Sequence, residues 1–169
     1  LEGQLSYSRL LADNHQIDGL LLYNMRDYVN ADAASAIYSL PYRTQGIAAR
    51  LSYSYKGRYF IEGNFGYNGS ENFSKGNKWG FFPSVAGGWL VTNEKFMENA
   101  LSVLSKLKFR GSYGLVGNDQ LAGRRFAFLS TINSGNGFTY GLTGNQGIGG
   151  KFEGDFGVED LSWETVKKT

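Results

Sequence analysis

Apolar and polar residues alternate with a period of two along most of this chain. Between residues 45 and 55 the larger apolar residues share one face: Ile47, Ala49, Leu51, Tyr53 and Tyr55. The alternation restarts over residues 59–68, directly after Lys56-Gly57. A period of two is typical of β-strands, and two such runs joined by a short Gly-containing turn predict a tight hairpin.

The same alternation marks further strands on both sides of this hairpin. It runs over residues 17–26, 79–91 and 106–115, is least regular over 3–11, and resumes at 161–168. The regular runs are about ten residues long, whereas strands of soluble proteins average about five or six and membrane-spanning strands need about nine to eleven. The sequence therefore predicts an all-β antiparallel meander of about six long strands and the start of a seventh.

The predicted connections alternate in length. Short ones lie near 12–15, 56–57 and 92–104, and long polar or Gly-rich ones lie near 28–43, 69–78 and 117–160. Short turns at one end and long loops at the other are typical of outer-membrane β-barrels. Aromatic residues near strand ends suit the two girdles of such a barrel: Tyr53, Tyr55, Tyr59, Tyr67, Trp79 and Trp89.

One short connection has the pattern of a helix. Thr92 or Asn93 can cap it, and an apolar stripe follows at helical spacing: Phe96, Met97, Ala100, Leu101 and Leu104. We expect a packed cap at the periplasmic rim of the barrel. Because the chain begins without Met and inside an apparent strand, we also expect it to be a piece of a longer protein.

Composition agrees with a β-rich chain that has many turns. The chain has 24 Gly, 12 Phe and 11 Tyr but only 2 Pro, which favours strands and turns. Its net charge of +2 is too small and dispersed to indicate nucleic-acid binding. It has no Cys, which excludes disulfides and thiolate metal sites. No apolar run reaches the length of about 18 residues that a transmembrane helix needs.

The residues that carry common catalytic or metal chemistry do not form a known motif. His15 is the only histidine and falls in a predicted solvated turn, so a metal site or Ser-His-Asp triad would rest on it alone. The carboxylates at 153, 155, 159 and 160 fit no standard calcium loop. The Gly-rich run at 141–157 lacks the ending of a phosphate loop and is predicted to be a flexible extracellular loop. We expect no enzyme activity and no cofactor.

Two stretches resemble a known family. The run KGRYFIEGNFGYNGSENFSKGNKWGFFPSVAGGW, followed by EKFM and LKFRGSYGLVGN, occupies residues 56–118, and DLSWETVKKT ends the chain. These linked motifs resemble the C-terminal barrel of SusC/RagA-family TonB-linked outer-membrane proteins. Residues 1–42 are compatible with the family and less diagnostic.

The resemblance implies a role in nutrient import. It implies a multi-pass barrel of about 22 strands in the outer membrane of a Bacteroidetes-like bacterium. It also implies a SusD-like surface lipoprotein as partner and a glycan or peptide as substrate. TonB would act through an N-terminal region, and the plug domain is absent from these 169 residues. The prediction for 1–169 is a partial TonB-dependent receptor barrel domain in contact with outer-membrane lipid.

Two groups of residues are candidate contact sites. Loop aromatics can stack on a substrate, pack against the lipoprotein, or pin the loops to one another: Phe73, Phe126, Phe128, Phe138, Tyr140, Phe152 and Phe156. Polar residues opposite the apolar face are predicted to face the lumen, along the import path or against the plug: Arg50, Glu62, Asn64, Lys108 and Arg110.

Three other functions stay open at this stage. A soluble β-sandwich that binds carbohydrate would need shorter strands and an apolar face buried against a second sheet. An outer-membrane barrel enzyme would need a catalytic pairing that His15 does not offer. A passive porin would differ from a transporter by lacking a plug upstream.

Overall fold

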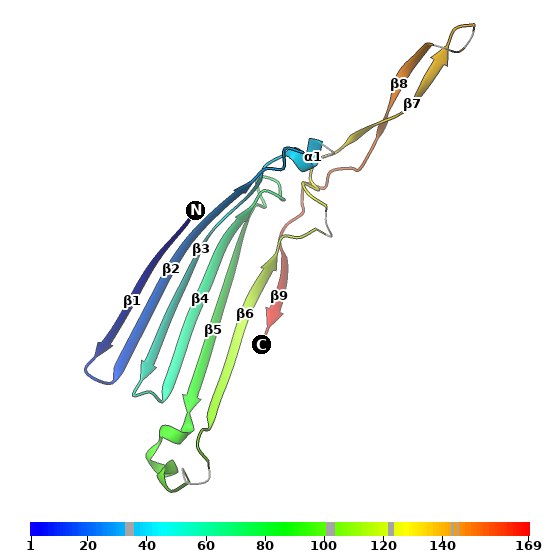
Figure 1. Ribbon diagram of the computed structural model, residues 1–169. Coiled ribbons are helices and arrows are strands. Elements are labelled where there is room, and N and C mark those ends of the chain that lie inside the picture. Colours follow the sequence, from blue (N-terminus) through cyan, green and yellow to red (C-terminus); the bar gives the residue numbers. More distant parts are fainter. Residues whose placement is uncertain (33–35, 101–103, 122–123, 143, 145) are drawn as a thin grey trace.

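The computed structural model describes residues 1–169 except 33–35, 101–103, 122–123, 143 and 145. Seven strands form one antiparallel sheet in the order β1-β2-β3-β4-β5-β6-β9, and two more form a separate hairpin (Figure 1). The strands of the sheet are β1 Glu2–Leu11, β2 His15–Tyr28, β3 Tyr42–Tyr55, β4 Tyr59–Ser70, β5 Trp79–Leu90, β6 Lys108–Asn118 and β9 Glu164–Lys168. The hairpin consists of β7 Ile132–Tyr140 and β8 Gln146–Glu153. The helical segments are α1 Ala36–Ser39 and the 3-10 helices η1 Val91–Asn93 and η2 Lys95–Ala100.

Tight turns set the register of the long strands. Between β3 and β4, Lys56 and Gly57 have φ values of 52° and 62°, and Arg58 N donates to Tyr55 O at 2.9 Å. Two consecutive positive φ values define the turn that suits the twist of a hairpin, and Gly adopts one without cost. The predicted hairpin is therefore confirmed, with Tyr55 and Tyr59 as its first pair.

One face of the sheet is apolar and has an aromatic row near each end. Tyr67 stacks on Trp79 at 4.8 Å near the end with long loops, and Tyr59 stacks on Trp89 at 6.4 Å near the other end. Apart from glycines at 19, 63 and 87, the positions between these pairs are aliphatic or aromatic, such as Leu21, Ala49, Leu51, Ile61, Phe65 and Val85. About ten residues separate Trp79 from Trp89 on β5, which is about 33 Å along a strand and about 25 Å along a barrel axis at a tilt of about 40°. That height matches the apolar band of an outer-membrane barrel.

The two ends of the sheet differ in the length of their connections (Figure 1). At the short-turn end lie the turns at 12–14 and 56–58 and the segment with η1 and η2. At the long-loop end lie α1, residues 71–78 and the segment that contains β7 and β8. The predicted alternation of short and long connections is therefore present. By the usual pattern of such barrels, the short-turn end corresponds to the periplasmic side.

The structure refines three details of the sequence prediction. The helix expected within 92–104 is present as the short 3-10 helices η1 and η2, and Leu101 lies outside the described residues. The predicted caps are wrong, because η1 begins after Leu90 and has no side-chain cap, and Phe96 is 67% exposed where a packed residue was expected. The Gly-rich run at 141–157, predicted to be a loop, contains strand β8. His15, predicted in a turn, is the first residue of β2 and is half-buried, because its ring packs beside Tyr53 and Tyr55.

The buried side chains do not lie on the apolar face. They gather mainly at the long-loop end, where Phe73 and Phe126 are 0% and 7% exposed. On the apolar face Leu51 and Ile61 remain 61% and 56% exposed, because no second sheet covers that face among the described residues. A β-sandwich buries its apolar face between two sheets, so the sandwich alternative is wrong and the open sheet matches a segment of barrel wall.

Candidate functional site

A hydrogen-bonded network lies at the middle of the polar face, opposite the apolar one. Glu62 accepts hydrogen bonds from Ser52 Oγ at 3.0 Å and from Asn64 Nδ2 at 2.8 Å. Arg50 donates from Nε to Asn64 Oδ1 at 3.0 Å, and this Nε lies 3.9 Å from the Glu62 carboxylate. The register brings these groups together, because Arg50 pairs with Asn64 and Ser52 pairs with Glu62. Three of the predicted lumen-facing residues thus form one connected group.

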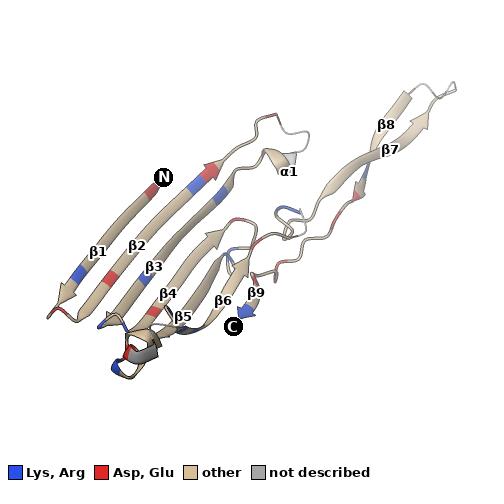
Figure 2. Ribbon diagram, turned by 60° about the horizontal axis from the view of Figure 1, so that its bottom comes forward, with Lys and Arg blue, Asp and Glu red and all other residues tan. Residues whose placement is uncertain are grey.

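The polar face continues onto β1 and β2. Asp18 pairs with Ser52 in the sheet and accepts hydrogen bonds from Ser8 Oγ at 2.6 Å and from Gln16 Nε2 at 2.9 Å. Gln16 also donates to Ser8 Oγ at 3.0 Å. Charged positions are few along the strands, as Figure 2 shows. On this face Asp18, Arg50 and Glu62 are held by neighbouring side chains, which limits the number of conformations they sample.

Lys108 and Arg110 bring positive charge to the same face from β6. Arg110 pairs with Gly88 of β5, and the ammonium of Lys108 lies 4.2 Å from the centre of the Phe60 ring. Neither residue forms an ion pair within the described part of the chain. Both therefore keep donors available for another molecule.

A shallow pocket of about 400 Å³ separates these cations from the carboxylates. Asp18 and Glu62 contribute acceptors from β2 and β4, and Lys108 and Arg110 contribute donors from β6. The two walls are of opposite charge, with Phe60 and small residues such as Ser52, Ala86 and Gly88 between them. Such a pocket can hydrogen-bond a ligand that carries both donors and acceptors, such as a hydroxyl-rich or zwitterionic one.

A second cluster packs the loops against the long-loop end of the sheet. The ring of Trp163 lies 5.5 Å from that of Phe73 and 5.1 Å from that of Phe82. The indole Nε1 of Trp163 donates to the carbonyl of Lys78 at 3.1 Å. Because Phe73 is completely buried here, its position fits the alternative in which loop aromatics pin the loops together.

Asp119 joins three segments beside this cluster. Its Oδ2 accepts from Ser70 Oγ at 2.7 Å and from Tyr42 Oη at 3.1 Å, and its carbonyl accepts from Asn72 Nδ2 at 3.1 Å. Ser70 and Asn72 are buried, so these bonds replace contacts with water. The loop after β4 and the loop after β6 are thereby fixed to the start of β3.

Phe126 and Phe128 lie in a smaller cluster at the base of the hairpin. Their rings meet edge to face at 6.2 Å, and Phe126 is buried. Arg125 lies 4.9 Å from the Phe126 ring centre and donates to the carbonyl of Leu40 at 3.1 Å. These contacts tie the hairpin segment to the loop after β2. The geometry again fits the packing alternative for Phe126.

The other candidate aromatics are exposed. Phe138 is 72% exposed, and three more are at least 45% exposed: Tyr140, Phe152 and Phe156. Figure 1 shows the hairpin projecting away from the sheet. These side chains are therefore available to a substrate or a partner, whereas Phe73 and Phe126 are not.

A β-bulge decides which way the hairpin aromatics point. Gly135 pairs with Gly150 and Phe138 with Ile148, so β7 has one extra residue over this stretch. The extra residue places Phe138 on the same face as Ile148 and Phe152, since side-chain direction alternates along a strand. We call the residues Phe138, Tyr140, Ile148 and Phe152 the hairpin apolar face.

Known proteins resemble this chain in both its sheet and its loops. The RagAB peptide importer in its closed-closed state matches 98% of this chain with a TM-score of 0.76 and 19% identity. A TonB-dependent receptor of Formosa agariphila is 33% identical over 122 residues, or 72% of this chain. The TonB-dependent receptor SusC of Bacteroides thetaiotaomicron is 42% identical over 80 residues, or 47% of this chain.

The chain belongs to the SusC/RagA family of TonB-dependent receptors. No family model matches it. It spans 12% of the Formosa receptor, 8% of SusC and 20% of the matched RagAB chain. The fold of this SusC/RagA-family segment is thus shown to be part of a barrel, as the strand pattern predicts.

We also searched the described residues of this receptor segment for a metal site and for a membrane-spanning helix. No cluster of three or more His, Cys, Asp or Glu side chains that could hold a metal ion occurs among them. No helix within them is long and apolar enough to cross a membrane. His15 Nδ1 instead lies 2.7 Å from the hydroxyl of Tyr53, which gives the only histidine a structural partner.

Sequence reasoning missed several residues that shape this part of the receptor. Asp18 and Ser52 belong to the polar network, and their alternation with apolar neighbours was a usable signal. Asp119 and its partners had no such signal, because they meet only after three loops fold together. Trp163 stood at the centre of a family-like motif, but its ring contacts could not be read from that motif.

Proposed function

We propose that this chain is a section of barrel wall in an outer-membrane nutrient transporter, and that its polar face lines the lumen. The observation that supports this most is the contrast between the two faces of one sheet. One face is an apolar band between two aromatic rows, and the other holds a network around Glu62. A wall between hydrocarbon and a water-filled lumen needs this division.

The substrate we propose is a glycan or a peptide, taken up by the whole receptor without chemical change. The pocket between Asp18 and Glu62 on one side and Lys108 and Arg110 on the other supports a polar solute. Both glycans and peptides carry donors and acceptors in close succession. Arg50 and Asn64 would then hold Glu62 in place beside the import path.

We further propose that a SusD-like surface lipoprotein docks at the long-loop end and that TonB acts through a region outside this chain. The hairpin apolar face supports this docking, since monomeric proteins rarely leave such a cluster uncovered. Phe156, three residues after the end of β8 at the base of the hairpin, is 71% exposed. The matched RagAB structures are described as a peptide importer and a peptide transporter.

The docking proposal is tested with the full-length receptor, purified from outer membranes in mild detergent. Mass spectrometry of co-purifying proteins should find a SusD-like lipoprotein. Replacing Phe138 and Phe152 with Ser should reduce its recovery, because both side chains lie on the hairpin apolar face. Ile132→Ser is the matched control, since Ile132 is 75% exposed on the opposite face of the same hairpin.

The import proposal is tested by uptake of labelled oligosaccharides and peptides in cells that carry the receptor. Glu62→Gln and Arg110→Ala should each lower uptake without lowering the amount of receptor in the outer membrane. Recovery of the receptor in the soluble fraction would overturn the proposal as a whole. Unchanged uptake in both variants would remove the polar face from the import path.

A further inference from the structure

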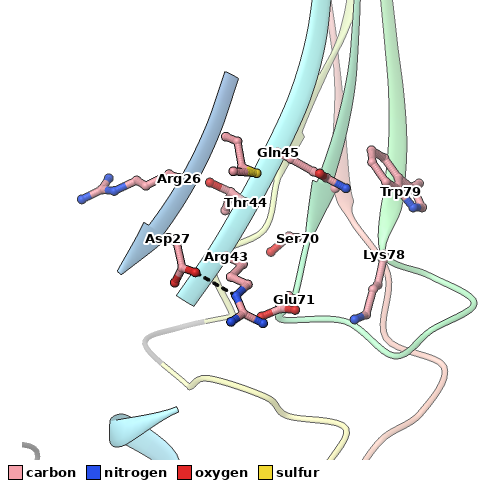
Figure 3. Close-up of a pocket in the computed structure, with 11 residues that line it drawn as sticks. Arg26, Asp27, Arg43, Thr44, Gln45, Ser70, Glu71, Lys78 and Trp79 are labelled. Carbon is pink, nitrogen blue, oxygen red and sulfur yellow. Dashed lines mark hydrogen bonds and ion pairs between the residues drawn. The ribbon is translucent and has the colours of Figure 1, made fainter. Parts of the chain in front are cut away.

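A second pocket lies on the apolar face, at its long-loop end (Figure 3). Its volume is about 350 Å³. One row of the sheet forms its floor, because Met25 pairs with Gln45, Gln45 with Gly69 and Gly69 with Trp79. These four residues point to the face opposite the import pocket. This hollow is therefore separate from the polar face described above.

Gly69 and Trp79 give the hollow its shape. A Cβ atom at position 69 would lie 3.0 Å from the Trp79 ring, so a larger residue there would displace the indole by a few tenths of an ångström. Tyr67 stacks on the indole at 4.8 Å with an angle of 10° between the rings. Trp79 lines the pocket and Tyr67 does not, so the tyrosine supports the indole from the side away from the hollow.

Charged side chains form the wall toward the long loops. Arg43 Nε donates to Asp27 Oδ2 at 3.0 Å, in the row beyond the floor. Glu71 and Lys78 line the same wall, and Figure 3 shows Glu71 beside Arg43 and Lys78 farther along, below Trp79. The backbone of Lys78 is fixed, because its carbonyl accepts a hydrogen bond from Ser70 N at 3.0 Å. Among the described residues Lys78 forms no ion pair, which leaves its ammonium available.

The position of the hollow along the sheet indicates which part of a lipid molecule would contact it. Toward the middle of the sheet the next row consists of Tyr23, Ile47, Tyr67 and Phe81. These side chains are 38–57% exposed, and on the proposed function they contact the hydrocarbon of the outer leaflet. The hollow thus lies at the level of lipid head groups, where a polar ligand with an apolar tail fits both regions.

We propose that this pocket binds the phosphorylated sugar head group of an outer-leaflet glycolipid. A pyranose ring stacks against the Trp79 indole, and its hydroxyls bond to Gln45 and to the Arg43–Asp27 pair. Lys78 contacts the phosphate, because an ammonium is a strong partner for that group. The acyl chains lie over Tyr67 and Phe81. The proposal rests on the membrane position in the proposed function and adds a lipid ligand to it.

The test uses the full-length receptor in nanodiscs and native mass spectrometry of bound lipid. The probe is lipid A with one phosphate, compared with phosphatidylglycerol and with acyl-free glucosamine phosphate. Trp79→Leu and Lys78→Gln should each weaken lipid A binding about tenfold. Trp79→Leu keeps an apolar side chain at this level. Trp89→Leu is the matched control, since Trp89 lies on the same strand and face at the short-turn end and does not line the pocket, and it should bind lipid A like the unaltered receptor.

Three outcomes would overturn the proposal. Equal binding of lipid A by Trp79→Leu and the unaltered receptor would mean that no sugar stacks there. Equal binding of phosphatidylglycerol and lipid A would mean that charge alone attracts lipid. Equal binding of glucosamine phosphate would mean that the ligand is a soluble sugar. Each can occur while uptake and lipoprotein docking stay normal, so failure here is distinct from failure of the proposed function.

Discussion

The seven-stranded sheet and the β7–β8 hairpin are both antiparallel, but they obtain their apolar faces in different ways. In the sheet each strand pair advances residue by residue, so simple alternation keeps Leu51 and its neighbours on one side. In the hairpin a bulge between Gly135 and Phe138 is needed to bring the aromatic residues together. The sheet is thus specified by its pattern of residues, and the hairpin by one irregularity of its backbone.

The largest expected loss of stability comes from the buried cluster of Phe73 and Trp163 at the long-loop end, in contrast to the exposed hairpin. Phe73→Ala removes a ring that is 0% exposed between Trp163 and the rest of the loop cluster. We expect a loss of about 3–5 kcal/mol in the free energy of unfolding, because a cavity replaces the ring. Chemical denaturation of the full-length receptor in lipid vesicles measures it.

Phe138→Ala is the matched control for this change. Phe138 is 72% exposed, so its loss should alter stability by no more than about 0.5 kcal/mol. Similar losses in the two variants would show that the hairpin is packed in the whole receptor and that the contrast drawn here is wrong.

A charge placed on each apolar face should give the next largest difference. Leu51 lies midway between the two aromatic rows. Leu51→Arg should destabilise the receptor by about 2–4 kcal/mol, the cost of a guanidinium at the middle of the bilayer. Ile148→Arg, on the hairpin apolar face, should cost no more than about 0.5 kcal/mol. The measurement is again denaturation in vesicles.

Ser52→Arg completes that comparison on the polar face. It tests whether the penalty depends on the face and not on the strand, since Ser52 is the next residue after Leu51. A penalty equal to that of Leu51→Arg would contradict the assignment of the two faces to lipid and lumen.

The sequence predicted the sheet well because the membrane imposes one rule on every strand. Alternation located six strands, and the turn at Lys56-Gly57 was placed correctly. The hairpin was missed because Gly is frequent in it and the bulge breaks the alternation between Gly135 and Phe138. A period-two pattern cannot be recognised across a bulge whose position is unknown.

The candidate sites were predictable to a similar degree. The five polar-face residues follow from alternation, and the structure places them on one face of β3, β4 and β6. Their contact with a substrate stays a prediction. The loop aromatics could not be divided into buried and exposed sets, since burial of Phe73 depends on Trp163, about 90 residues further along the chain.

Changing the bulge should affect the hairpin and leave the sheet unaltered. A Cβ at position 137 would collide with the backbone carbonyl of Ile148, so Gly137→Ala cannot keep the present pairing. We expect a local cost of about 1–3 kcal/mol and loss of the hairpin apolar face. Hydrogen exchange should increase in residues 132–153 and stay unchanged in β3 and β4.

Gly149→Ala is the control for this variant. No atom lies within 4 Å of a Cβ at position 149, on the strand opposite the bulge. Its hairpin should exchange like that of the unaltered receptor and recover the same amount of lipoprotein. If Gly137→Ala behaved in the same way, the bulge would not determine the direction of the aromatic residues.

The smallest expected effect concerns the short-turn end of the sheet and is a dependence on pH. Hydrogen bonds from Tyr59 Oη at 2.7 Å and Trp89 Nε1 at 3.2 Å, together with Arg58 at 3.1 Å, hold the pKa of Glu94 below its ordinary value of 4.5. A carboxylate with a lowered pKa stabilises the folded state fully above its unfolded pKa, and this contribution is lost as the pH falls through the folded pKa. The free energy of unfolding, measured between neutral and acidic pH, should therefore decrease less steeply below about pH 4.5 for Glu94→Gln than for the unaltered receptor.

Glu153→Gln, in the exposed hairpin, is the control and should leave this pH dependence unchanged. If Glu94→Gln and the unaltered receptor showed the same pH dependence, the hydrogen bonds around Glu94 would not stabilise the short-turn end of the sheet.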